Sequence, residues 1–160
     1  MDKQDFTRQV KQMERRLYRV AMSYTGNEAD AADTVQEALL RAWAKRDTLR
    51  DESLFSTWMT RILINECKTL LRKRRRITPM ETLPQQGNQS PLDSQDDLRA
   101  ALLSLEPHYR VPLVLNALEG YTLREIAGML RLPEGTVKSR VSRARRQLRM
   151  YNQEVNDDAE

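Results

Sequence analysis

Residues that bind metals or form disulfides are nearly absent from this sequence, which has one cysteine and one histidine in 160 residues. A single cysteine cannot form an internal disulfide, and this fits a protein of the reducing cytoplasm. Zinc sites need clustered His and Cys side chains, so Cys67 and His108 do not predict a metal centre. No carboxylate cluster, Cys–His pair or phosphate-binding loop occurs either. We therefore expect no catalytic residues, no metal, no cofactor and no small-molecule substrate.

Aromatic residues and long apolar runs are also scarce. Phe, Trp and Tyr make up 6% of the sequence, and the apolar–polar alternation of half-buried strands is absent. Leu, Ala, Arg and Glu dominate instead, which predicts an all-α fold. No apolar run approaches the roughly 18 residues of a membrane span, and the first residues lack the apolar core of a signal peptide. These absences favour a cytoplasmic protein with one domain or two small ones.

The net charge of +4 conceals four blocks of alternating sign. Residues 1–76 carry 17 basic and 11 acidic residues, a net charge of +6, whereas residues 77–97 have four acids and no base. Residues 98–149 carry ten basic and four acidic residues, again +6, and residues 150–160 have four acids and no base. Two basic blocks separated by an acidic spacer predict two separate contacts with a polyanion.

A change in composition after residue 76 predicts a boundary between two helical domains. Between residues 77 and 93 the helical periodicity disappears, and Pro79, Pro84, Gly87 and Pro91 occur among Gln, Asn and Ser. Such a composition is typical of a flexible linker. We therefore expect one domain over residues 1–76, a linker over 77–93, a second domain over 94–150 and an acidic tail over 151–160.

Apolar residues recur at helical spacing in three stretches of the first domain. They predict helices over residues 5–24, 28–46 and 55–75, with Gly26 ending the first and residues 47–54 forming a loop. In the second helix, the residues expected to face the core are Ala32, Val35, Leu39, Ala42 and Trp43. In the third, they are Phe55, Trp58, Met59, Ile62, Leu63, Cys67, Leu70 and Leu71.

The outward side of the second helix has the character of a protein-docking face. An acid pair lies beside an outward-facing leucine and an arginine, and the whole set is Asp33, Gln36, Glu37, Leu40 and Arg41. An ordinary solvated face remains the alternative, since a single exposed leucine needs no explanation.

The outward side of the third helix has the character of a nucleic-acid surface. Polar residues stand at i, i+4, i+7 and i+11, and these are Arg61, Asn65, Lys68 and Arg72. The helix then ends in five consecutive cations, Arg72–Arg76. Asn amides suit base edges, whereas Lys and Arg suit phosphates.

In the second domain, apolar spacing predicts two short helices and then a helix-turn-helix. Pro107 starts the second of the short helices, Pro112 is expected to kink it or delay its start, and Gly120 closes it. The sequence then has a capping box formed by Thr122 and Glu125. The two helices that follow are separated by a short break at residues 131–133, as in a helix-turn-helix.

The second helix of this motif has an apolar side and a polar, cationic side. The apolar side consists of Val137, Val141, Ala144 and Leu148. The polar side consists of Thr136, Lys138, Ser139, Ser142, Arg143 and Arg146. Residues 138–149 carry six cations and no acid, and these repel one another unless a polyanion is bound. A solvated basic face is the alternative, but a helix of this kind suits the major groove of DNA.

Four segments resemble the bacterial extracytoplasmic-function sigma factors, a two-domain form of the sigma family. Residues 31–43 (AADTVQEALLRAW) resemble the helix that docks on the RNA polymerase clamp. Residues 55–65 (FSTWMTRILIN) resemble the promoter-melting segment. Residues 119–127 (EGYTLREIA) and 134–145 (EGTVKSRVSRAR) resemble the helix-turn-helix of region four. The chain departs from the family at Arg131, where a turn glycine is usual, and at Leu49 and Leu123, where aromatics are common.

The resemblance implies a site for each partner. Core RNA polymerase, through its beta-prime clamp and beta flap, would be bound with Asp33, Gln36, Glu37, Leu40 and Arg41. The minus-ten promoter element would be melted and read by Leu49, Arg50, Arg61, Asn65, Lys68 and Arg72, with phosphates held by Arg74, Arg75 and Arg76. The minus-thirty-five element would be read by Asn116, Leu123, Arg124, Thr136, Lys138, Ser139, Ser142, Arg143 and Arg146. It further implies a membrane-associated anti-sigma factor, and a monomer when the protein is free.

A conventional operator-binding regulator with a helix-turn-helix is the main alternative. Such regulators usually dimerise to match a palindromic site, and the sequence shows no dimerisation helix after residue 150 and no effector pocket. Activity with core polymerase would separate the two functions, because an operator-binding repressor does not confer initiation on the core enzyme.

Overall fold

The computed structural model describes residues 1–77 and 94–158, and it places side chains for residues 1–75 and 97–158. Within these ranges it contains helices and no strand, which confirms the predicted all-α class. The chain divides into two compact units, Met1–Gln85 and Gln86–Glu160. The linker expected over residues 77–93 lies outside the described residues, apart from Ile77. None of the described helices is long and apolar enough to cross a membrane.

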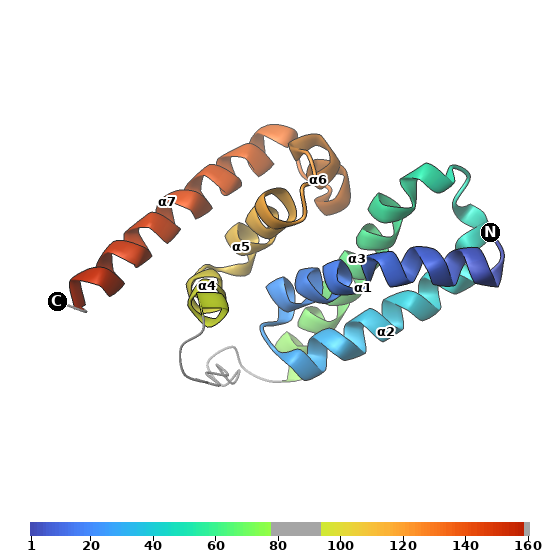
Figure 1. Cartoon of the computed structure of the whole chain (residues 1–160), viewed down its shortest axis with the longest axis horizontal. Coiled ribbons are helices and arrows are strands. Elements are labelled where there is room, and N and C mark those ends of the chain that lie inside the picture. Colours follow the sequence, from blue (N-terminus) through green and yellow to red (C-terminus); the bar gives the residue numbers. More distant parts are fainter. Residues whose placement is uncertain (78–93, 159–160) are drawn as a thin grey trace. The chain divides into compact units, whose positions relative to one another are not determined.

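The first unit is a bundle of α1 (Lys3–Thr25), α2 (Glu28–Ala44) and α3 (Phe55–Ile77), with each helix in contact with the other two (Figure 1). Gly26 ends α1 in the left-handed conformation, with φ at 64°. Asn27 then caps α2, because its side chain accepts a hydrogen bond from the Asp30 N–H at 3.1 Å. Only these two residues connect α1 and α2, so the two helices form a hairpin.

Aromatic and aliphatic side chains from all three helices form the core of the first unit. The ring of Phe6 packs edge-on against Trp43, with centroids 5.2 Å apart, and against Phe55, with centroids 5.8 Å apart. The aliphatic part of the core consists of Leu17, Val20, Met59, Leu63 and Ile64, which are all buried. Thr60 is also fully buried, although it belongs to no predicted apolar stripe.

The buried side of α2 is shifted by one residue from the predicted one over most of the helix, and of the predicted set only Ala42 is fully buried. Ala32 is exposed, and the buried residues are Asp30, Ala31, Thr34, Ala38 and Ala42. Alanine fits either pattern, so periodicity alone could not decide between them. Small buried side chains let α2 approach α1 and α3 closely, and the larger Val35, Leu39 and Trp43 are therefore half-buried at its edges.

The second unit contains α4 (Ser94–Leu103), α5 (Pro107–Leu113), the π-helical turn η4 (Val114–Leu118), α6 (Leu123–Leu130) and α7 (Glu134–Asp158). Pro112 does not delay α5, which begins at Pro107. The irregularity follows the proline, where the Glu119 N–H donates to the Val114 carbonyl at 3.1 Å in the wider π pattern. Gly120, with φ at 76°, then closes the segment as predicted.

The predicted helix-turn-helix is formed by α6 and α7. Both hydrogen bonds of the Thr122–Glu125 capping box are present at 3.1 Å, which confirms the expected start of α6. Arg131 ends α6 in the left-handed conformation with φ at 56°, a conformation that is costly for residues other than glycine. α7 buries Val137, Val141 and Ala144, and it continues through the acidic stretch after residue 150 as far as Asp158.

Candidate nucleic-acid and docking surfaces

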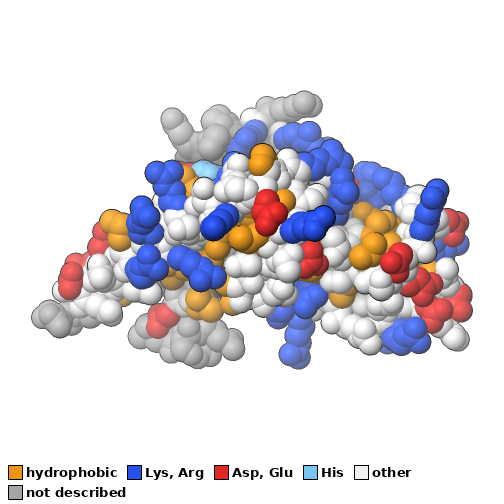
Figure 2. Space-filling model, turned by 90° about the horizontal axis from the view of Figure 1, so that it is seen from above, with side chains coloured by type: hydrophobic (Ala, Val, Ile, Leu, Met, Phe, Trp, Pro, Cys, Tyr) orange, Lys and Arg blue, Asp and Glu red, His pale blue; other side chains and the backbone are white. Residues whose placement is uncertain are grey.

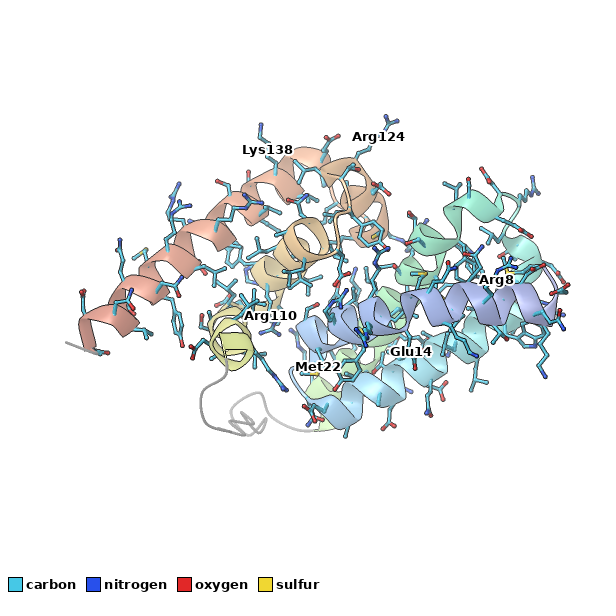
Figure 3. The ribbon with its side chains drawn as sticks, in the orientation of Figure 1. Arg8, Glu14, Met22, Arg110, Arg124 and Lys138 are labelled. Carbon is cyan, nitrogen blue, oxygen red and sulfur yellow. The ribbon has the colours of Figure 1, made fainter. Side chains whose placement is uncertain are left out.

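The outer face of α7 combines small polar and cationic side chains. Lys138, Ser139, Ser142 and Arg146 are exposed on the side opposite the buried valines. Figure 3 shows Lys138 projecting from the same side of the second unit as Arg124 of α6. In the space-filling view, Lys and Arg side chains follow the middle of α7 and acidic side chains lie at its C-terminal end (Figure 2). The helix-turn-helix therefore presents a positive ridge of the size that a major groove accepts.

One edge of this ridge is held by a side chain of α5. The Arg143 Nη1 donates a hydrogen bond to the Tyr109 hydroxyl at 3.1 Å, and the guanidinium lies 5.9 Å from the centre of the Tyr109 ring. Arg143 is nevertheless exposed. Tyr109 has no role predicted from the sequence, because the local pattern does not connect residues 34 positions apart.

The other edge of the ridge is held through Asn116 of η4. Its side-chain N–H donates to the Tyr121 carbonyl at 2.9 Å, and its oxygen accepts a longer hydrogen bond from Arg145 at 3.4 Å. Both ends of the Asn116 amide thus have partners within the unit, although the resemblance gave this residue a place in DNA binding. Of the other residues in that set, Leu123 and Thr136 are half-buried.

Arg110 is a cation that does not belong to the ridge. It is 6% exposed, its Nη1 donates to the Leu105 carbonyl at 3.0 Å, and burial lowers the pKa of its guanidinium. Its hydrogen bond joins the end of the α4–α5 connection to α5, so its contribution is to the fold of the second unit.

In the first unit, the polar line of α3 faces solvent as predicted. Arg61, Asn65 and Arg72 are exposed, and Lys68 is half-buried. The loop before α3 supplies Leu49, which is half-buried, and Arg50, which is exposed. These side chains offer amide, guanidinium and ammonium groups along one side of a single helix and at the loop preceding it.

The loop before α3 is shaped by local hydrogen bonds. The Asp51 carboxylate accepts from the Ser53 N–H at 3.0 Å and from the Ser53 hydroxyl at 2.7 Å. These bonds lower the pKa of Asp51, the hydroxyl contributing most. At the other end of the loop, the Arg46 guanidinium stacks 3.9 Å from the Trp43 ring centre and donates to the Trp43 carbonyl at 2.8 Å. Leu54, the last residue before α3, is 55% exposed.

The basic end of α3 is not a uniform set of cations. Arg74 forms an ion pair and a hydrogen bond with Asp30, a buried carboxylate in the first turn of α2. Arg75 is exposed, and the side chain of Arg76 lies outside the described residues. Arg74 therefore joins α3 to α2, whereas Arg75 is accessible to a phosphate.

The outer face of α2 is exposed at each residue of the predicted docking set, Asp33, Gln36, Glu37, Leu40 and Arg41. Leu40 is 66% exposed, so its side chain is accessible to a partner. Arg41 forms an ion pair with Glu66 of α3, whose side chain is only 13% exposed. The face thus has an accessible leucine between acids and an arginine already held by α3.

Chemistry based on thiols or metals finds no support in the described residues. Cys67 is buried in the core, and burial raises the pKa of its thiol to about 12, so the thiol stays protonated near neutral pH. The described residues contain no cluster of His, Cys, Asp and Glu suited to a metal ion.

Comparison with known proteins gives matches for both units. Residues 9–77 match the family described as Sigma-70 region 2, and residues 95–148 match Sigma-70, region 4. The ECF RNA polymerase sigma factor SigE of Mycolicibacterium smegmatis is 36% identical over 89% of this chain, which spans 59% of the length of that relative. SigV of Bacillus subtilis, an RNA polymerase sigma factor, is 33% identical over 84% of this chain and 82% of its own length.

Two solved structures are similar along nearly the whole chain. The sigma factor RpoE of Bartonella quintana, solved with the anti-sigma factor NepR, is 30% identical with a TM-score of 0.79, over 93% of this chain and 97% of that one. CnrH, solved with the cytosolic domain of CnrY, is 26% identical with a TM-score of 0.72, over 95% of this chain and 90% of that one.

Proposed function

This chain belongs to the ECF RNA polymerase sigma factors, and on that premise we propose that it directs bacterial core RNA polymerase to specific promoters. The family is one of transcription initiation factors, not of enzymes in the usual sense. The protein would act in the bacterial cytoplasm as a dissociable subunit, monomeric when free. It would supply recognition and strand separation while the core enzyme supplies the chemistry.

The observation that carries this proposal is that each of the two units has a cationic surface. The first unit has, in addition, a separate docking face on α2. The helix-turn-helix suits duplex DNA, because its exposed ridge is positive, narrow and rich in donors. We assign the minus-thirty-five element to this ridge. Ser139, Ser142 and Arg143 lie nearest the base edges in this assignment, and Lys138 and Arg146 bind phosphates.

The minus-ten element is assigned to the first unit. Reading a base in a melted element requires removing it from the stack, at a cost of a few kcal/mol. The loop before α3 is held at both ends and contains Leu49 and Arg50, and Arg61 and Asn65 follow it on α3. Such an arrangement suits a site for a base removed from the stack. Lys68, Arg72 and Arg75 then bind the phosphates next to it.

The polymerase-docking surface is assigned to the outer face of α2. An exposed leucine flanked by acids suits a partner with an apolar patch and basic rim, and we place the beta-prime clamp there. The second unit would meet the beta flap. One structural relative was solved with an anti-sigma factor, and the other with the cytosolic domain of CnrY. We therefore also propose that an anti-sigma factor, anchored at the membrane, holds this protein inactive.

Promoter-dependent transcription with purified core enzyme tests this function. A cognate promoter is first identified by sequencing the transcripts obtained from a promoter library. Adding the protein to core RNA polymerase is then expected to give abortive initiation on that promoter. A conventional operator-binding regulator would bind DNA alone and give no initiation with core enzyme, and that result would refute the proposal.

A further inference from the structure

Tyr109 occupies a position from which it controls a side chain of the recognition helix. It lies in the first turn of α5 and is half-buried, with the His108 ring packed against it at a centroid distance of 4.1 Å. Its hydroxyl accepts the hydrogen bond from Arg143 at 3.1 Å, and its ring faces the same guanidinium at 5.9 Å. The hydroxyl and the ring of one tyrosine of α5 thus contact the same arginine of α7.

We propose that Tyr109 is a positioning residue for promoter recognition, which presets the Arg143 guanidinium for its contact with the minus-thirty-five element. This inference rests on the proposed function. Tyr109 acts through Arg143 and need not touch DNA itself.

The physical basis is the entropy of a long side chain. An arginine that is ordered only when DNA binds loses much rotamer freedom at that step. An arginine already held in the binding orientation loses less, and its affinity rises accordingly. The hydrogen bond to Tyr109 uses one N–H of the guanidinium, so the other N–H groups remain for a base or phosphate. Arg143 is exposed, and its contact with Tyr109 is made to a hydroxyl and not to a carboxylate, so its charge remains accessible to the ligand.

A double-mutant cycle on the reconstituted holoenzyme tests the proposal. Tyr109→Phe keeps the ring and removes only the hydroxyl, and it should weaken binding to the cognate promoter about three- to tenfold, the range of one lost hydrogen bond. Discrimination against a promoter substituted in the minus-thirty-five element should fall with it. In an Arg143→Ala background, Tyr109→Phe should have no further effect. Tyr151→Phe, which removes a hydroxyl elsewhere on α7, is the matched control and should bind as the parent does.

Three results would overturn the proposal. The same loss in both backgrounds would mean that Tyr109 contacts DNA or supports the fold without Arg143. Unchanged binding by Tyr109→Phe would remove its role. Tighter binding would mean that Tyr109 withholds Arg143 from DNA.

A measurement on the free full-length chain is independent of DNA and of the polymerase. The Nε–Hε group of Arg143, observed by NMR, should be ordered in the parent and in Tyr151→Phe, and it should become mobile in Tyr109→Phe. An Arg143 side chain that is equally mobile in all three proteins would refute the positioning.

The two hypotheses fail in distinguishable ways. Absence of initiation by the parent protein with core enzyme would refute the sigma function. Initiation that depends on Arg143 but not on Tyr109 would leave that function intact and refute only the positioning.

Discussion

Replacing Arg74 tests whether the basic end of α3 is one phosphate-binding run or two kinds of cation. The Asp30 side chain is 12% exposed, and Arg74 supplies its ion pair. Removing one partner of a fully buried pair costs about 3–5 kcal/mol. The loss here should be smaller, because the Arg74 side chain is 38% exposed to screening solvent and Asp30 lies in the first turn of α2, where the helix dipole favours a carboxylate. We expect Arg74→Ala to lower the free energy of unfolding by about 1–3 kcal/mol.

Tryptophan fluorescence is a suitable assay, because both tryptophans, Trp43 and Trp58, belong to the first unit and report its unfolding. A loss of that size lowers the melting temperature by roughly 4–8 °C per kcal/mol for a domain of this length. Asp30→Asn combined with Arg74→Ala should recover most of the loss, since no unpaired buried charge then remains. Arg75→Ala is the matched control and should stay within about 0.5 kcal/mol of the parent. Equal destabilisation by Arg74→Ala and Arg75→Ala would refute the reasoning.

Three further predictions concern the proposed surfaces. Leu40→Asp should leave the thermal unfolding curve unchanged and abolish binding to core polymerase in a pull-down; full retention of core would remove the docking assignment. Arg143→Ala should weaken binding to the cognate minus-thirty-five element by about 1–3 kcal/mol if the contact is bidentate, and an equal loss on random duplex would make Arg143 a phosphate anchor. Asn65→Ala should relax discrimination at one minus-ten position without changing the salt dependence of holoenzyme binding, whereas Arg75→Ala should weaken all promoters alike and flatten the slope of log K against log salt by about 0.9. A changed slope with unchanged base preference in Asn65→Ala would place the base-reading site elsewhere.

Features encoded by neighbouring residues could be predicted from the sequence. The Thr122–Glu125 capping box and the glycine ends at Gly26 and Gly120 depend on residues a few positions apart, and each is present as expected. The exposed line of α3 was predicted for the same reason, since helical periodicity alone separates Arg61 and Asn65 from the core.

Features that depend on distant partners could not be predicted. Arg74 lies 44 positions from Asp30, and Arg143 lies 34 positions from Tyr109. Periodicity shows that a cation faces outward but not which side chain of another helix it meets. The shifted stripe of α2 has a different cause, because alanine is equally compatible with a buried and an exposed position, so the packing of neighbouring helices decides.

These distant contacts change what the basic blocks imply about DNA. Each block has a formal charge of +6, but Arg41 and Arg74 are paired with carboxylates from another helix, and Arg110 is buried. A cation that stays paired or buried displaces no counterion when DNA binds, and therefore adds nothing to the salt slope. The slope of holoenzyme binding should accordingly follow the exposed cations that reach phosphates, such as Arg75, Lys138 and Arg146, rather than the formal charge of either block. The cations held within the units position the helices on which those contacts depend.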